Sequence, residues 1–216
     1  MKKDLQDIYA SWIEKYGENF SGVFSVSNVD GVIFQQACGY RNKAEELPNT
    51  AETAFGIASG GKLFTGLAIC KLIDEGKLSL EDKLCELLSV DLGKIDKRIT
   101  VFHLLTHTSG VCDYLYGEEE NEDYEKQLLA QYPLYMWTRL EYYLQMITPL
   151  SPIFEPGERY SYTNSGYILL GLVVEAVSGI SYQQFVHDNI IAVCSLTNTG
   201  FYRMDSLPPN TALGYM

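Results

Sequence analysis

Residues 21–40 hold the feature that most limits how this chain can fold. They read SGVFSVSNVDGVIFQQACGY, two runs rich in β-branched and aromatic residues on either side of Asp30-Gly31. An Asp-Gly pair between two such runs is a strong signal for a β-hairpin. Because one hairpin is too little to close a sheet, the chain must combine these strands with other elements.

Helical patterns fill most of the remaining sequence. Residues 4–16 carry an apolar stripe at helical spacing, and residues 60–75 repeat the pattern up to a glycine. The side chains expected to face the core from 60–75 are Leu63, Phe64, Leu67, Ala68 and Leu72. Residues 122–147 and 165–178 are also predicted to be helical. The expected fold class is therefore α+β, with an antiparallel sheet, packed helices and a mostly helical subdomain.

The character of the sequence changes at Ser59. Residues 1–58 are predicted to form the N-terminal helix and β-hairpin of an α/β subdomain, and residues 59–216 a mostly helical subdomain. A length of 216 residues suits one compact body of two subdomains. With 46% hydrophobic residues, the chain can bury a substantial core.

Charge and composition exclude several partners. The net charge of −12 argues against binding to a nucleic acid. No stretch approaches the ~20 consecutive apolar residues of a membrane span. One acidic stretch is predicted to be a solvated loop that leads into a helix. Its members are Glu118, Glu119, Glu120, Glu122, Asp123 and Glu125.

The cysteines and the N-terminus bear on localisation. No two of the five cysteines have C-x-x-C spacing, which fits free thiols in a reducing compartment. The first 20 residues lack the apolar core of a signal peptide. The chain as it stands is therefore expected to be cytoplasmic, whereas removal of a leader would make it extracellular.

Residues 58–66, ASGGKLFTG, place Lys62 three positions after Ser59. A serine hydroxyl is a poor nucleophile until a base takes its proton, and a neutral lysine can be that base. Helical i, i+3 spacing puts both side chains on one face, at a helix start that favours negative charge. The alternative is a plain helix start. Gly60 and Gly61 favour the catalytic interpretation, because they weaken a helix but let a substrate approach the backbone.

A second candidate is Tyr162-Thr163-Asn164. A phenol beside a lysine can shuttle a proton, and an amide can orient both the lysine and a substrate carbonyl. Tyr40-Arg41-Asn42 has the same pattern but ends a strand, whereas the later copy precedes an apolar helix. The alternative for Tyr162 and Asn164 is a packing tyrosine and a capping asparagine.

His103 and His107 are four residues apart, a spacing that can bind zinc. The stretch HLLTH lacks the glutamate of H-E-x-x-H, and no third ligand is evident. Structural histidines are therefore the preferred interpretation, and the sequence predicts neither a metal nor a cofactor.

Several stretches in sequence order are more specific together than either motif alone. They are FGIASGGKLFTG, ITVFHLLTHTSG, FEPGERYSYTNSGYILLG, ISYQQFVHDNI and NTGF. From about Gly22 to Tyr215 the chain resembles the serine β-lactamase-like family, in particular its group of class C β-lactamases, penicillin-binding proteins and esterases. The resemblance implies a β-lactamase/transpeptidase-like fold.

The resemblance also implies roles for individual residues. Ser59 matches the catalytic serine, Lys62 its proton partner and Tyr162 a second proton-transfer group. Asn164 matches a substrate-positioning amide. The backbone N–H of Ser59 would supply half of an oxyanion hole, and the stretch from His107 to Gly110 looks like scaffold.

One departure from the family concerns its third motif, a lysine or histidine with a glycine two residues on. No lysine follows Lys126, and His187 is followed by Asp188-Asn189. Asn198-Thr199-Gly200 lies where the family has an ordinary T-G-F stretch. The chain is thus expected to be an N-terminal fragment of a longer enzyme, without several strands, a terminal helix and half of the oxyanion hole.

Two functions remain open at this point. The first is a serine acyl-transfer hydrolase that forms an acyl-enzyme on Ser59, with a β-lactam, a D-alanyl peptide or a small ester as substrate. The alternative is a catalytically silent binding or sensing module that retains the pocket. Because an incomplete sheet leaves backbone groups unpaired at its edge, the chain is expected either to self-associate through that edge or to be only marginally stable.

Overall fold

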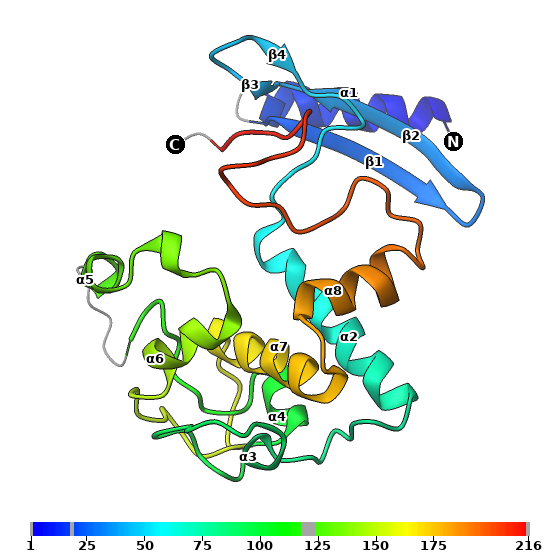
Figure 1. Ribbon diagram of the computed structural model, residues 1–216. Coiled ribbons are helices and arrows are strands. Elements are labelled where there is room, and N and C mark those ends of the chain that lie inside the picture. Colours follow the sequence, from blue (N-terminus) through cyan, green and yellow to red (C-terminus); the bar gives the residue numbers. More distant parts are fainter. Residues whose placement is uncertain (1, 18–19, 118–123, 215–216) are drawn as a thin grey trace. The chain divides into compact units, whose positions relative to one another are not determined.

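The computed structural model describes residues 2–17, 20–117 and 124–214 (Figure 1). They divide into two compact units, one from within 1–58 and 197–216 and one from within 59–196. The division between Ala58 and Ser59 lies where the sequence changes character. Most of the crowded acidic residues, Glu118, Glu119, Glu120, Glu122 and Asp123, lie outside the described residues.

The last twenty residues correct the predicted division. The sequence pattern places them in the helical subdomain, but the described residues from 197 to 214 belong to the first unit. Backbone hydrogen bonds explain the grouping, because Ala54 N donates to Asn210 O and Ala212 N donates back to Ala54 O. This pairing between distant segments leaves no local signal in the sequence.

In its described residues, the first unit contains one α-helix and two small antiparallel sheets. Its elements are α1 (Lys2–Tyr16), β1 (Gly22–Asn28), β2 (Gly31–Cys38), β3 (Tyr40–Asn42) and β4 (Leu47–Pro48). The predicted hairpin is present, with Asn28 opposite Gly31 at its tip. Rings from α1 pack on the hairpin, where Tyr9 lies 5.7 Å from Phe24 and 5.6 Å from Phe34 between ring centroids.

The second unit is helical. A 3-10 turn at Ala58–Gly61 leads into α2 (Lys62–Asp74). The other elements are α3 (Leu84–Leu87), α4 (Val101–Leu105), α5 (Tyr124–Gln131), η3 (Leu134–Met136), η4 (Leu140–Tyr143), α6 (Leu144–Ile147), α7 (Asn164–Ser178), α8 (Tyr182–Val186) and a π-helical turn at His187–Ile191. The predicted helix over 122–147 is broken into pieces, because Pro133 cannot donate an N–H to a continuing helix.

Helix α7 forms the centre of this unit and contacts α2, α4 and α8. Its Leu169, Leu170, Val173 and Val174 are completely buried, so hydrophobic burial holds this helix, and whatever its N-terminus carries, in place. No single helix of the described ranges is long and apolar enough to cross a membrane. By length and composition alone, α7 and the segment Tyr182–Ile191 would together be long and apolar enough, but the chain bends by 79° between them.

The face that α2 buries differs in part from the predicted one. Leu63 and Leu67, expected inside, are 65% and 42% exposed. Ala68 and Leu72 are buried as predicted, and Thr65 and Ile69 complete the buried stripe. Thr65 can be buried because its hydroxyl shares a 2.8 Å hydrogen bond with the Tyr182 hydroxyl of α8. An apolar count misses such a position, since threonine is counted as polar.

Candidate active site

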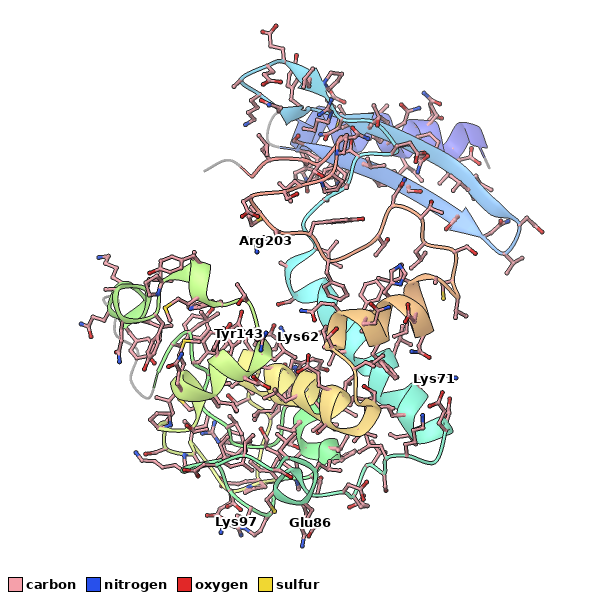
Figure 2. All side chains as sticks on the ribbon, viewed as in Figure 1. Lys62, Lys71, Glu86, Lys97, Tyr143 and Arg203 are labelled. Atoms are coloured by element: carbon pink, nitrogen blue, oxygen red, sulfur yellow. The ribbon has the colours of Figure 1, made fainter. Side chains whose placement is uncertain are left out.

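The turn that precedes α2 explains why Ser59 and Lys62 meet. Ser59 lies in the 3-10 turn, and Lys62 is the first residue of α2 (Figure 2). Side chains three residues apart eclipse one another in 3-10 geometry. Lys62 Nζ accordingly donates to Ser59 Oγ over 3.1 Å. Ala58, directly before the serine, has φ of 43°, a left-handed conformation that is uncommon for alanine.

The segment before α7 explains the Y-x-N spacing. Thr163 has extended backbone angles, φ −146° and ψ 134°. In extended chain, alternate side chains point to the same side, so Tyr162 and Asn164 share one side while Thr163 is turned away and buried.

These two local patterns form one hydrogen-bonded cluster. The Tyr162 hydroxyl lies 2.7 Å from Ser59 Oγ. Lys62 Nζ donates to Asn164 Oδ1 over 2.8 Å, and the Tyr162 hydroxyl lies 3.3 Å from the same oxygen. Of the residues that the sequence singled out, Ser59, Lys62, Tyr162 and Asn164 are therefore in direct contact. Such an arrangement can take a proton from a serine hydroxyl and pass it on.

Electrostatics in the cluster favour proton transfer through the phenol. Partial burial raises the pKa of Tyr162, but hydrogen bonding with Lys62 and Ser59 and the positive charge of Lys62 lower it by more. The net pKa of Tyr162 therefore lies below its ordinary value of 10.0. A phenol with a lowered pKa is a better proton acceptor at neutral pH than an ordinary tyrosine, because more of it is ionised.

The stretch from His107 to Gly110 positions the segment that carries Tyr162. Ser161 N donates to His107 O over 2.9 Å, and Gly157 N donates to Thr108 O over 2.8 Å. Gly110 has φ of 72°, and a Cβ at this position would lie 2.1 Å from the carbonyl oxygen of Phe154. Glycine is required here by both conformation and close approach.

The two histidines have separate contacts. His107 is buried, accepts a hydrogen bond from Thr163 N at Nδ1 over 3.2 Å, and has its ring centroid 4.7 Å from that of Tyr162. His103 Nδ1 lies 3.2 Å from Thr100 N and completes the capping box at the start of α4. Within the described ranges, no group of three or more His, Cys, Asp or Glu side chains could hold a metal ion.

The remaining candidates are the two glycines between Ser59 and Lys62 and the earlier Y-x-N stretch. Gly60 and Gly61 belong to the 3-10 turn, and Gly61 has an ordinary φ of −59°. A Cβ added to Gly61 would meet no atom within 4 Å beyond its chain neighbours. Packing within the described chain therefore does not require glycine at position 61. Tyr40 and Asn42 lie in β3 of the first unit.

Asp113 is a residue of this site that the sequence patterns do not reveal. The residue is 8% exposed, and its carboxylate accepts hydrogen bonds from Asn164 N over 2.6 Å and from Asn164 Nδ2 over 3.0 Å. The only available signal is its place three residues after Gly110, at the end of a stretch that looks like scaffold.

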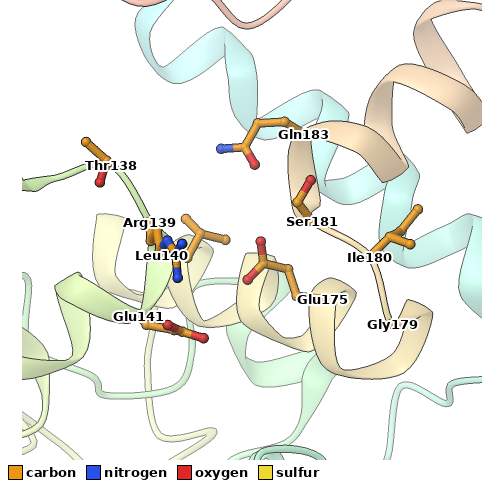
Figure 3. A pocket seen from close by; sticks show the side chains of 9 residues that line it. All are labelled: Thr138, Arg139, Leu140, Glu141, Glu175, Gly179, Ile180, Ser181 and Gln183. Carbon is orange, nitrogen blue, oxygen red and sulfur yellow. The ribbon is translucent and has the colours of Figure 1, made fainter.

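A separate cavity of about 480 Å³ opens beside the C-terminal half of α7. Figure 3 shows the Glu175 carboxylate and the Gln183 amide extending into this space, with Arg139 on the opposite wall. One oxygen of Glu175 accepts Tyr182 N over 2.9 Å, which ties α7 to the start of α8. None of the lining residues belongs to the cluster around Ser59.

Comparison with known proteins agrees with the observed fold. Penicillin-binding protein 4* of Bacillus subtilis (strain 168) is 31% identical over 100% of this chain and 46% of its own length. The crystal structure of a penicillin binding protein from Bacillus halodurans is 38% identical with a TM-score of 0.83, over 96% of this chain and 60% of that one. An octameric penicillin-binding protein homologue from Pyrococcus abyssi is 31% identical with a TM-score of 0.77, over 99% of this chain and 48% of that one.

These likenesses confirm the expected α+β fold of the β-lactamase/transpeptidase type. The chain spans about half the length of the Bacillus subtilis protein. Residues 10–216 match the family described as Beta-lactamase. Since the match covers nearly the whole chain, the protein belongs to the beta-lactamase family, a family of serine hydrolases that includes penicillin-binding proteins.

Proposed function

We propose that this chain carries the acylating centre of a serine hydrolase of the β-lactamase and penicillin-binding-protein type. One observation carries the proposal. Ser59 Oγ is in hydrogen-bond contact with two groups that can take part in transferring its proton, the Tyr162 hydroxyl at 2.7 Å and Lys62 Nζ at 3.1 Å. Contacts of this length meet the geometric requirement for general-base activation of a serine.

The reaction proceeds in two steps. In the first, Ser59 Oγ bonds to the acyl carbon of the substrate, the bond from that carbon to its leaving nitrogen or oxygen breaks, and the serine proton passes through Tyr162 to the leaving group. In the second, water attacks the ester on Ser59, releases the acid and returns a proton to the serine. Lys62 donates to Ser59 Oγ, so its charge opposes the negative charge that develops on this oxygen, and its second hydrogen bond, to Asn164 Oδ1, holds it in place.

The substrate class is also part of the proposal. The relatives are named for penicillin binding, and the centre suits a β-lactam, a D-alanyl peptide or a small ester, since each presents a carbonyl with a leaving nitrogen or oxygen. The Asn164 side-chain NH₂ donates one hydrogen to Asp113, and we propose that its second hydrogen orients such a carbonyl.

Covalent labelling tests the proposal. The protein is incubated with a penicillin or a fluorophosphonate, digested, and mapped by mass spectrometry. We expect label on Ser59 and none in Ser59→Ala. Ser151→Ala is the matched control, because Lys94 Nζ donates to Ser151 Oγ over the same 3.1 Å. Label on another serine contradicts the assignment. Reversible penicillin binding without label supports a catalytically silent binding module instead.

A further inference from the structure

Asp113 is the only aspartate or glutamate among the described side chains that is buried. The proposed reaction gives it no chemical step. A buried carboxylate is costly unless hydrogen bonds compensate for the lost water, so its contacts indicate what it is for. They come from two places, the adjacent loop and the first residue of α7.

Three N–H groups surround the Asp113 carboxylate. Oδ1 accepts Leu115 N over 2.9 Å, and Oδ2 accepts both Asn164 N over 2.6 Å and Asn164 Nδ2 over 3.0 Å. Because Asn164 is the first residue of α7, the carboxylate also lies at the positive end of that helix. Asp113 therefore binds the backbone and the side chain of the same catalytic-site residue.

The side-chain contact determines which way the Asn164 amide faces. A carboxylate oxygen only accepts hydrogen bonds, so the NH₂ group must face Asp113 and Oδ1 must face the other way. That leaves Oδ1 to accept the 2.8 Å hydrogen bond from Lys62 Nζ. In the reversed amide, Oδ1 would lie against the carboxylate and the NH₂ group against the lysine ammonium, and both contacts would be repulsive.

These contacts link Asp113 to the nucleophile, and the inference from them rests on the proposed function. We propose that Asp113 is a positioning residue for acylation: it fixes the amide orientation of Asn164, and through that amide it holds Lys62 against Ser59. Asp113 touches neither Ser59 nor the substrate, and its effect reaches Ser59 through three hydrogen bonds in series, Asp113 to Asn164, Asn164 to Lys62 and Lys62 to Ser59.

Asp113→Asn is the first variant to test. It has nearly the same size, but its single oxygen cannot accept from both the Leu115 side and the Asn164 side. We expect single-turnover labelling of Ser59 by a fluorophosphonate to slow by about 10²-fold, as is typical when a reacting group loses its support.

Ser165→Ala is the matched control, since the fully buried Ser165 hydroxyl accepts Tyr114 N over 2.9 Å and joins the same loop to the same helix end. We expect its labelling rate to stay within about twofold, because it does not touch the Asn164 amide.

A double-mutant cycle separates positioning from general loss of stability. If Asp113 acts through the Asn164 amide, then Asp113→Asn should slow labelling by less than about threefold when Asn164 is already alanine, because residues that act as a unit are not additive. Equal slowing in both backgrounds overturns the proposal. So does a labelling rate in Asp113→Asn that equals the wild-type rate.

A measurement on the unaltered protein covers the case in which Asp113→Asn does not fold. The Asn164 side-chain amide is observed by ¹⁵N NMR and assigned from its loss in Asn164→Ala. We expect its protons to exchange with water much more slowly than those of Asn198, which donates over a similar 2.9 Å to Glu52 but is exposed. Equally fast exchange overturns the positioning role. Absence of wild-type labelling at Ser59 would instead overturn the proposed function, while the exchange rates still decide whether Asp113 holds the amide.

Discussion

The two units of this protein bury their side chains very differently. Among the described residues, every buried apolar side chain except Phe34 lies in the second unit. The second unit builds one continuous core around α7, whereas the first relies on rings of α1 packed on a two-stranded sheet. Two-stranded sheets are marginally stable on their own, so the units are expected to differ in stability.

This difference matters because the whole cluster belongs to the second unit. Ser59 lies in the turn before α2, and Lys62 is the first residue of that helix. Tyr162 lies directly before α7, and Asn164 is the first residue of this largely buried helix. Hydrogen-bond geometry at a reacting group must be held to within a fraction of an ångström. The core of the second unit, and not the hairpin, is therefore expected to set the positions of these four side chains.

The largest expected effects are on acylation. Lys62→Ala removes a contact to Ser59 and a contact to Asn164, whereas Tyr162→Phe removes the phenol but leaves the lysine in place. Both should slow acylation within the range of about 10²–10⁴-fold that general bases provide, with Lys62→Ala the slower. Single-turnover labelling of Ser59 measures both. Normal acylation in Lys62→Ala would show that the lysine is only a helix residue.

The acid limb of the pH–rate profile sharpens this prediction. Tyr162 must lose its proton to act as a base, and its lowered pKa lets the rate rise with pH below the ordinary value of 10.0. Removing Lys62 removes a hydrogen bond and a positive charge that lower this pKa. We therefore expect the acid limb of Lys62→Ala to move to higher pH, and a limb that does not move would argue against Tyr162 as the titrating base.

A core substitution tests whether the units differ in stability. Leu170→Ala in α7 empties space at a completely buried site and should cost about 2–5 kcal/mol of unfolding free energy. The protein has two tryptophans, Trp12 in the first unit and Trp137 in the second. Tryptophan fluorescence therefore reports the first unit in Trp137→Phe and the second unit in Trp12→Phe. We expect Trp12 to report unfolding at lower urea concentration, and Leu170→Ala to shift the Trp137 transition. Coincident transitions would show that the units unfold together.

Local sequence patterns predict those parts of the site that depend on local geometry. Ser59 and Lys62 meet through i, i+3 spacing, and Tyr162 and Asn164 through alternation along extended chain, so each pair is visible in four or fewer residues. That the two pairs join each other is not visible in either motif. Contacts between residues about a hundred positions apart depend on the packing of α2 against α7. The expectation that the two pairs form one site therefore comes from the resemblance to a known family.

The failures have a common physical cause. Asp113 and Thr65 are polar residues whose burial depends on a partner from a distant segment, Asn164 for one and Tyr182 for the other. Hydrophobic periodicity treats such positions as surface, which also leads to the wrong inward face for Leu63 and Leu67. The grouping of residues 197–214 with the first unit escapes prediction for the same reason, since it depends on pairing between distant backbones.

The first unit offers a smaller effect, on association. Within the described residues β1 pairs only with β2, so each strand leaves an outer row of backbone N–H and C=O groups without a strand partner. We expect concentration-dependent association through this edge, measured by light scattering. Val32→Lys, at a 59% exposed position of β2, should weaken this association, whereas Val193→Lys, at a 73% exposed position of the second unit, should not. A monomer at all concentrations would contradict the edge as a contact surface.

The smallest expected effect is on pH-dependent stability, and it comes from His107. Burial, followed by the charge of Lys62, lowers the pKa of His107 below its ordinary value of 6.5, and the Asp113 charge only partly opposes this. The folded protein therefore binds fewer protons than the unfolded chain, so the stability contributed above about pH 6.5 is lost as the pH falls below that value. The structure supplies the cause, since protonated Nδ1 would meet the Thr163 N–H that it now accepts.

His107→Asn keeps an acceptor near this position, tolerates the φ of 57°, and does not titrate. Urea unfolding should show a lower free energy of unfolding at pH 5 than at pH 7 in wild type, and a smaller difference in His107→Asn. An unchanged difference would place the titrating group elsewhere.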